Sequence, residues 1–317
     1  MTSYIIRRIL YAIPIALGVA VIIFSLIHIA PGDPLSALVP ADAPSSVVDR
    51  LRQDYGMDRS LPAQFALWLG RVMSGDLGVS IATRRPVAGE LSVAVVNTLI
   101  LAVCASLIGF PLGIVLGGIA GYFKGRLADR LATATAIAGV SVPHYWLGML
   151  LVIVFSVELN LLPAIGMGPG GSAGWAWDWL HLRHLVLPAV TLSVIPMGIV
   201  TRTVRATVSE ILNEEFVEAL RAKGLREYQV MRHVAKNAAP TVMAVIGLQL
   251  GYLLGGSILV EVVFGWPGTG FMLNTAILRR DLPLLQGTIL VLAMFFVLVN
   301  LVVDILQTVI DPRMQRA

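Results

Sequence analysis

Acidic and basic side chains are gathered in one short stretch of this chain, residues 213–224. Glu214 and Glu215 stand at its start, where the dipole of a helix favours carboxylates. Arg221 and Lys223 stand near its end, where the dipole favours cations. Charges ordered in this way predict a short helix in contact with water. A helix with these charges can bind another surface.

The same stretch carries signals for both ends of a helix. Asn213 is predicted to cap the start, and Gly224 to supply the left-handed residue that ends it. The apolar residues at helical spacing are Leu212, Phe216, Ala219 and Leu220. A capped amphipathic helix of this kind is predicted to dock into a partner. The alternative is an ordinary loop helix that lies on the bilayer surface.

Signatures of bond-breaking chemistry are missing from the sequence. It contains no G-x-x-x-x-G-K-[ST] phosphate loop, no H-E-x-x-H or Cys/His metal cluster, and no G-x-S-x-G nucleophile elbow. We therefore expect no catalytic residue, no metal site and no cofactor in this chain. Uphill transport would need energy from a partner or from an ion gradient.

The composition is that of an integral membrane protein. Of 317 residues, 57% are hydrophobic and 13% are charged, against about 25% charged in soluble domains. The apolar residues form long runs, as membrane spans do. The formal net charge is +4, and no basic patch interleaved with aromatic residues predicts binding to nucleic acid.

Six apolar runs are long enough to cross a bilayer, at roughly 20 residues each. They are residues 9–30, 93–121, 134–162, 185–204, 242–264 and 284–310. Four groups of basic residues in the short loops fall on one side if both termini are cytoplasmic, and the opposite short loops hold only Arg183, Arg279 and Arg280, as the positive-inside rule requires. The fold class is therefore an all-α integral membrane protein with six transmembrane helices. Residues 31–92 become an extracytoplasmic segment, with helices predicted at 47–55 and 61–73.

Glycines recur within two of these runs. They are Gly109, Gly113, Gly117 and Gly121 in the second run, and Gly247, Gly251 and Gly255 in the fifth. Small residues on one face predict close helix packing, and the alternative is that the smooth face lines a transport path. Prolines that interrupt the runs are Pro111, Pro143, Pro188 and Pro196.

The turn-rich segment 264–270 (FGWPGTG) follows the fifth run. Trp266 and Pro267 are candidates for an outer re-entrant turn or gate, and an interfacial aromatic anchor is the alternative. Among the few ionisable residues, Glu261 is expected to be solvated at the outer end of its span. Asp304 is expected to pair with a basic residue of the fourth run, Arg202 or Arg205.

Residues 218–224 resemble the cytoplasmic loop motif of ABC-importer permeases, written E-A-A-x3-G-x9-I-x-L-P. Glu218, Ala219 and Leu220 stand three residues before Gly224, and residues 234–237 (VAKN) replace I-x-L-P. This variant looks like that of dipeptide, oligopeptide and nickel permeases. Segments that agree along the chain are 28–34 (HIAPGDP), 55–59 (YGMDR), 75–80 (GDLGVS), 84–87 (RRPV), 142–148 (VPHYWLG), 247–256 (GLQLGYLLGG), 264–268 (FGWPG), 302–304 (VVD) and 311–313 (DPR).

The whole chain is similar to the B-type subunit of a peptide permease. The resemblance implies a type I ABC importer in the plasma (inner) membrane of a bacterium or archaeon. It implies a homologous second permease, two cytoplasmic ABC ATPases that bind ATP and Mg, and an extracytoplasmic solute-binding protein. The cargo would be di- or oligopeptides or related small solutes, and glutathione and nickel chelates remain open.

Within this chain, the resemblance implies one transmembrane permease domain over 1–317. Residues 93–310 would be a five-span transport core, and 205–239 a cytoplasmic coupling segment. The implied contacts to the ATPases are Glu214, Glu215, Phe216, Glu218, Ala219, Leu220, Arg221 and Gly224. The alternative is a stand-alone secondary transporter or channel, for which paired charges deep in several spans or an inverted repeat are expected and not evident.

Overall fold

The computed structural model describes residues 2–29, 44 and 58–310. Within these residues the chain is helical, apart from turns and one isolated bridge between Val79 and Pro86. The elements are α1 (Thr2–Ile29), α3 (Leu61–Met73), α4 (Val87–Tyr122), α5 (Leu127–Ser141), α6 (His144–Leu151), the π-helix η2 (Val152–Glu158), the 3-10 turn η3 (Gly171–Ala173), α7 (Trp179–Ile211), α8 (Glu215–Ala222), α9 (Glu227–Val263), α10 (Thr269–Arg279) and α11 (Leu282–Ile310).

Four of these helices, α4, α7, α9 and α11, are long and apolar enough to cross a membrane. A fifth candidate is the bent pair formed by α5 with α6 and η2. The described apolar part of α1, Ile13–Ser25, is shorter than these spans. The described chain is therefore an all-helical membrane protein with four or five apolar spans, arranged in the predicted order.

The glycine repeat of α4 lies against α7, and its members are Gly109, Gly113, Gly117 and Gly121. A Cβ atom on Gly117 would lie 2.5 Å from the carbonyl oxygen of Thr201. On Gly109 it would lie 2.8 Å from the carbonyl oxygen of Ser193. Only a residue without a side chain lets the two backbones approach this closely. The packing interpretation of this repeat is confirmed.

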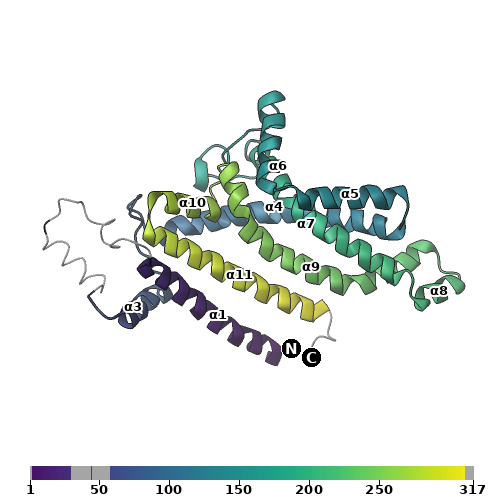
Figure 1. The fold of residues 1–317 in the computed structure, drawn as a ribbon, viewed down its shortest axis with the longest axis horizontal. Coiled ribbons are helices and arrows are strands. Elements are labelled where there is room, and N and C mark those ends of the chain that lie inside the picture. Colours follow the sequence, from purple (N-terminus) through teal and green to yellow (C-terminus); the bar gives the residue numbers. More distant parts are fainter. Residues whose placement is uncertain (1, 30–43, 45–57, 311–317) are drawn as a thin grey trace.

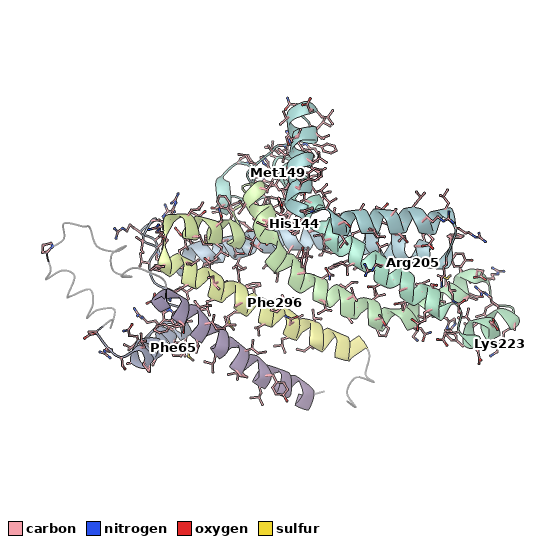
Figure 2. The ribbon with its side chains drawn as sticks, in the orientation of Figure 1. Phe65, His144, Met149, Arg205, Lys223 and Phe296 are labelled. Atoms are coloured by element: carbon pink, nitrogen blue, oxygen red, sulfur yellow. The ribbon has the colours of Figure 1, made fainter. Side chains whose placement is uncertain are left out.

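The predicted third span, residues 134–162, is not one straight helix. α5 ends at Ser141 and α6 begins at His144, with Val142 and Pro143 extended between them. Proline disfavours the helical conformation of the residue before it and lacks an amide donor, so the helix breaks here. The chain bends by 100°, and α6 projects from the bundle, where Figure 2 labels Met149.

The other three predicted breakers do not interrupt their helices. Pro111 lies inside α4, and Pro188 and Pro196 lie inside α7. α3 coincides with the helix predicted at 61–73. The helix predicted at 47–55 lies outside the described residues. α10 was not predicted, because its eleven residues fall between two apolar runs where the pattern indicates only a turn.

The two ends of the bundle carry different elements (Figure 1). α8 lies at one end of the long axis, close to the connection between α4 and α5. α10 and the first turns of α4 and α11 lie at the opposite end, together with α3. α1 begins and α11 ends on the side of α8. Any signal between the two ends must therefore travel along the helices.

Candidate functional site

The charged stretch folds into the short helix α8, but it begins differently from the prediction. Glu214, with extended backbone angles (φ −75°, ψ 144°), occupies the N-cap position. The side-chain amide of Asn213 instead donates a 2.7 Å hydrogen bond to the carbonyl oxygen of Ser209 in α7. The prediction that Asn213 caps α8 is wrong because this amide satisfies a free carbonyl at the end of the preceding helix.

Gly224 ends α8 in the left-handed conformation that the sequence predicts, with φ +79°. The amide of Leu225 donates to the carbonyl of Leu220 at 3.3 Å, and that of Gly224 donates to Arg221 at 2.9 Å. This pair of bonds is a Schellman motif. The Arg221 guanidinium also pairs with Glu227 of α9 at 2.9 Å. This ion pair thus joins the C-terminal end of α8 to the first residue of α9.

α8 has one face packed on the protein and one face open. Val217 is fully buried and belongs to the same core cluster as Val230 and Val234 of α9. The exposed side chains of α8 are Glu215, Phe216, Glu218, Ala219, Arg221 and Ala222. Lys223, directly after α8, marks this end of the molecule in Figure 2. Phe216 is 39% exposed, an unusual position for a phenylalanine beside water.

The predicted apolar face of α8 is thus divided between two surroundings. Leu212 and Leu220 pack against the core, whereas Phe216 and Ala219 are exposed. Val217 was missed as the anchor, although it stands three residues before Leu220 and so shares its face. The exposed set keeps two acidic side chains and one aromatic ring together. Such a surface can recognise a groove that has basic and apolar walls.

A partly buried ion pair joins α7, the helix before α8, to α5. Arg205 of α7 donates from Nε and Nη2 to the two carboxylate oxygens of Asp129 in α5, at 2.5 and 2.9 Å. Asp129 also accepts from the amide of Gly125 at 2.8 Å. Asp129 was not predicted as a partner of Arg205, whereas the expected pairing of Asp304 with Arg202 or Arg205 stays a prediction. The side chain of Asp304 lies outside the described residues.

At the opposite end, Glu261 of α9 is fully buried instead of solvated. It accepts hydrogen bonds from the Thr98 hydroxyl at 2.8 Å and from the amides of Gly270 and Phe271 at 2.7 and 3.1 Å. Those amides belong to the first turn of α10, where backbone donors have no partner within the helix. A carboxylate from one helix therefore caps the next one. The expectation of a solvated Glu261 is wrong, because the unpredicted α10 covers it.

The turn that contains Trp266 and Pro267 is bonded reciprocally to α4. The indole of Trp266 donates to the carbonyl of Asn97 at 2.9 Å, and the Asn97 amide donates to the carbonyl of Pro267 at 2.9 Å. Trp266 is fully buried, with its ring edge-to-face against Trp175 at 5.6 Å. The anchor interpretation is wrong, because an interfacial anchor needs an exposed ring. The gate role of Trp266 and Pro267 stays a prediction.

The glycines of the fifth run have separate environments. A Cβ on Gly247 would collide with Val303 of α11, and one on Gly251 would lie 3.2 Å from the ring of Phe296. Both therefore serve packing of α9 on α11. A Cβ on Gly255 would meet no described atom within 4 Å beyond its chain neighbours and the backbone of its own helix. Of the three, Gly255 has the open space that a path or a partner helix requires.

These features define a class of protein: a multi-pass helical membrane protein whose bundle ends in a short helix with one exposed face. The fold is similar to that of a chain of the MetNI methionine ABC transporter in an inward-facing conformation, with a TM-score of 0.57 and 18% identity over 70% of this chain and 96% of that chain. A second crystal form gives a TM-score of 0.51 with 20% identity, over 68% and 92% of the two chains. The architecture is that of a type I ABC importer.

Two family models together match almost the whole chain. "Binding-prot-dependent transport system membrane comp, N-term" covers residues 1–102, and "Binding-protein-dependent transport system inner membrane component" covers residues 109–316. The chain belongs to this family of inner-membrane ABC permeases. It is 39% identical to the glutathione transport system permease protein GsiC of Escherichia coli O6:H1 and 38% identical to GsiC of Pectobacterium atrosepticum, in each case over 98% of both chains.

Proposed function

We propose that this permease is one of two membrane subunits of an ATP-driven importer, and that α8 is the helix by which ATPases move it. The observation that carries the proposal is the exposed face of α8 at the extreme end of the bundle, backed by buried Val217. A helix fixed on one face and free on the other can transmit force without losing its own fold. Its coupling contacts are Glu214, Glu215, Phe216, Glu218, Ala219, Leu220, Arg221 and Gly224.

The assembly that we infer contains a homologous second permease, two cytoplasmic ABC ATPases that carry ATP and Mg, and an extracytoplasmic solute-binding protein. The missing phosphate loop supports placing ATP hydrolysis on other subunits. In this arrangement six spans cross the inner membrane with both termini in the cytoplasm. Residues 31–92 lie outside, 93–310 form the transport core, and 205–239 form the coupling segment.

The cargo that we propose is a di- or oligopeptide or a peptide-like solute. Support comes from the relatives that are named glutathione transport permeases and from the sequence pattern of the B-type peptide permeases. ATP would draw the two ATPases together, and with them α8 and the matching helix of the second permease. This movement would switch the bundle between outward-open and inward-open states, each stabilised by the ligands that bind it more tightly. A secondary transporter or channel is the competing function, and it would work without any ATPase.

The test exchanges one exposed charge of α8. Glu218→Lys is expected to weaken retention of the ATPases by about tenfold, the equivalent of about 1.4 kcal/mol, because it reverses a charge on the docking face. Glu210→Lys is the matched control, since Glu210 is also exposed but lies on α7 before the coupling helix. Both variants are purified from membranes together with the co-expressed ATPases, and the bound ATPase is quantified.

Selective loss with Glu218→Lys supports docking through α8. Equal ATPase retention in both variants contradicts it. Solute uptake that continues at full rate without ATPases contradicts the importer itself and favours the secondary transporter. The two failures are therefore distinguishable.

A further inference from the structure

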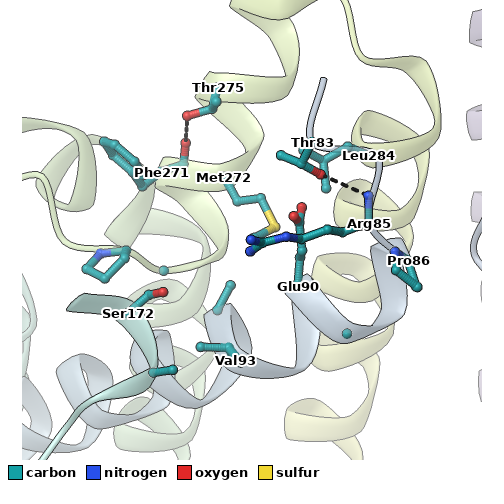
Figure 3. Close-up of a pocket in the computed structure, with 15 residues that line it drawn as sticks. Thr83, Arg85, Pro86, Glu90, Val93, Ser172, Phe271, Met272, Thr275 and Leu284 are labelled. Carbon is teal, nitrogen blue, oxygen red and sulfur yellow. Dashed lines mark hydrogen bonds between the residues drawn. The ribbon is translucent and has the colours of Figure 1, made fainter. Parts of the chain in front are cut away.

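A cavity of about 500 Å³ lies at the end of the bundle opposite α8. Its walls come from the loop before α4, the first turns of α4, α10 and the start of α11 (Figure 3). Apolar side chains contribute most of the surface, chiefly Val93, Phe271, Met272 and Leu284. Sites for small molecules have this size range and this mainly apolar character, with a few polar groups for orientation.

Two opposite charges reach into this cavity. The guanidinium of Arg85 and the carboxylate of Glu90 lie beside the sulfur of Met272 in the view of Figure 3. No ion pair joins the two, and neither charged group has a hydrogen-bond partner in the described part of the chain. Charged groups lining a largely apolar cavity are stabilised by partners of opposite charge. A ligand with both a carboxylate and an ammonium group would supply both partners.

The wall that carries Arg85 is held rigidly. Asp281, fully buried between α10 and α11, accepts from the Ser80 hydroxyl at 2.5 Å and from the amide of Ala82 at 3.0 Å. Burial opposes the charge on Asp281, but these hydrogen bonds and one from the Leu284 amide prevail and lower its pKa below the ordinary value. The loop before α4 is thus bound to the corner between α10 and α11 by an ionised carboxylate.

The opposite wall is supported by the capped turn described above. Pro267, Gly268 and Phe271 line the cavity, and Glu261 accepts from the amide of Phe271. Both walls are therefore built from buried, satisfied carboxylates, while the two charges inside the cavity are unpaired. Preorganised walls with unpaired charges between them are the arrangement of a binding site.

We propose that this cavity is a binding subsite for the charged termini of a short zwitterionic peptide. Arg85 binds the peptide carboxylate, and Glu90 binds the α-ammonium group. Small side chains of the peptide rest against Val93, Phe271 and Met272. A planar guanidinium matches a carboxylate with two parallel hydrogen bonds. The proposal rests on the proposed function, because it places a contact for peptide cargo on the side where the solute arrives.

The experiment measures protection of a thiol inside the cavity. The only native cysteine is removed by Cys104→Ala, and Met272→Cys introduces the reporter. Right-side-out vesicles that contain the assembled complex are labelled with a membrane-impermeant maleimide, with and without trialanine. At a trialanine concentration roughly ten times its dissociation constant, labelling is expected to slow about tenfold. N-acetyl-trialanine amide, which lacks both charges, is expected to give no protection.

Matched variants identify the groups responsible. Arg85→Gln and Glu90→Gln should each abolish protection by trialanine, with protection measured against the unprotected labelling rate of the same variant, because a neighbouring charge alters the reactivity of a thiol. Arg84→Gln is the control, because Arg84 is exposed, as Arg85 is, but does not line the cavity. Protection by the blocked peptide equal to that by trialanine overturns the proposal, and so does no protection by either.

Protection by ligand-free solute-binding protein but not by trialanine also overturns the subsite, because the cavity would then receive a protein loop. ATP-dependent uptake is measured on the same vesicles. Peptide protection without ATP-dependent uptake leaves the subsite standing and contradicts the importer. ATP-dependent uptake without peptide protection supports the importer and overturns the subsite.

Discussion

Gly224 and Gly125 share a backbone conformation but have different neighbours in the chain. Their φ angles are +79° and +81°, and a Cβ on either would meet no described atom within 4 Å. Gly224 ends α8, whereas Gly125 lies in the connection between α4 and α5. Variants at these two glycines can therefore distinguish the effect of strain at a left-handed residue from a specific role of α8.

We predict that Gly224→Val lowers the ratio of solute uptake to ATP hydrolysis. A β-branched residue in the left-handed region costs about 1–2 kcal/mol, so α8 would lose its stop. Gly125→Val introduces the same strain outside the coupling helix and is expected to keep the ratio. Uptake and ATP hydrolysis are measured together in proteoliposomes. A normal ratio in the Gly224→Val complex would exclude a coupling role for the cap.

Glu261 shows what one buried carboxylate can organise. It joins α9, α4 and α10 through three hydrogen bonds. We predict that Glu261→Gln destabilises the purified protein by about 1–3 kcal/mol, because one amide group cannot accept from all three donors and leaves a buried donor unsatisfied. Thermal unfolding in detergent measures this loss.

Glu158→Gln is the control for that substitution, since Glu158 is exposed. Thr98→Ser, which keeps the hydroxyl, should lie close to the parent protein. If Glu261→Gln unfolds at the parent temperature, the three hydrogen bonds do not hold the turn. The buried state of this residue could not be predicted from the sequence, because it depends on α10, whose pattern is too short to stand out.

At the scale of elements, close contact between α4 and α7 depends on individual glycines. Gly117 faces α7, where a Cβ would lie 2.5 Å from a carbonyl oxygen, whereas the adjacent Gly118 has open space. We predict that Gly117→Ala destabilises the bundle by about 1–3 kcal/mol, the usual range for overpacking. Gly118→Ala should be neutral or stabilise by up to about 1 kcal/mol through helix propensity.

The unfolding temperatures of the Gly117→Ala and Gly118→Ala variants test this prediction. Equal temperatures would mean that α4 and α7 are not in tight contact. The repeat itself could be predicted from the four-residue spacing of its glycines. Its partner helix could not, because spacing along one helix carries no information on which neighbour packs against it.

Local sequence signals were also insufficient for the start of α8 and for the break after α5. Composition and capping signals were sufficient to predict that α8 exists, that it ends at Gly224 and that α3 spans 61–73. They misplaced the start of α8, because the amide of Asn213 is used by α7. Pro143 was a visible breaker, but so were Pro111, Pro188 and Pro196, and only tertiary packing decides which proline bends a helix.

At the scale of the whole molecule, we predict that α8 and the peptide cavity lie on opposite sides of the membrane. With Cys104→Ala as background, the thiol from Ala82→Cys should react with an impermeant maleimide in right-side-out vesicles. The thiol from Lys223→Cys should react only after the membrane is made permeable. Both positions are exposed. Reaction of both thiols in sealed vesicles would contradict the proposed orientation.

The class of protein was readable from composition, apolar runs and ordered motifs, because each of these is a local property of the sequence. The cavity was not, because Arg85, Glu90, Met272 and Leu284 come from segments far apart in the chain. The ion pair between Arg205 and Asp129 was also not predicted. Long-range pairs depend on how helices are ordered around one another, and apolar periodicity does not specify that order.

α9 runs without interruption from Glu227, just after α8, to Val263, over 37 residues, and carries Glu261 near its end. At 1.5 Å per residue it is about 55 Å long. A helix of this length behaves as a lever, and a tilt of roughly 5° at one end displaces the other by about 5 Å. The same helix that packs against α8 therefore carries the carboxylate that shapes one wall of the proposed peptide cavity. A modest tilt of α9 is geometrically sufficient to distort that wall.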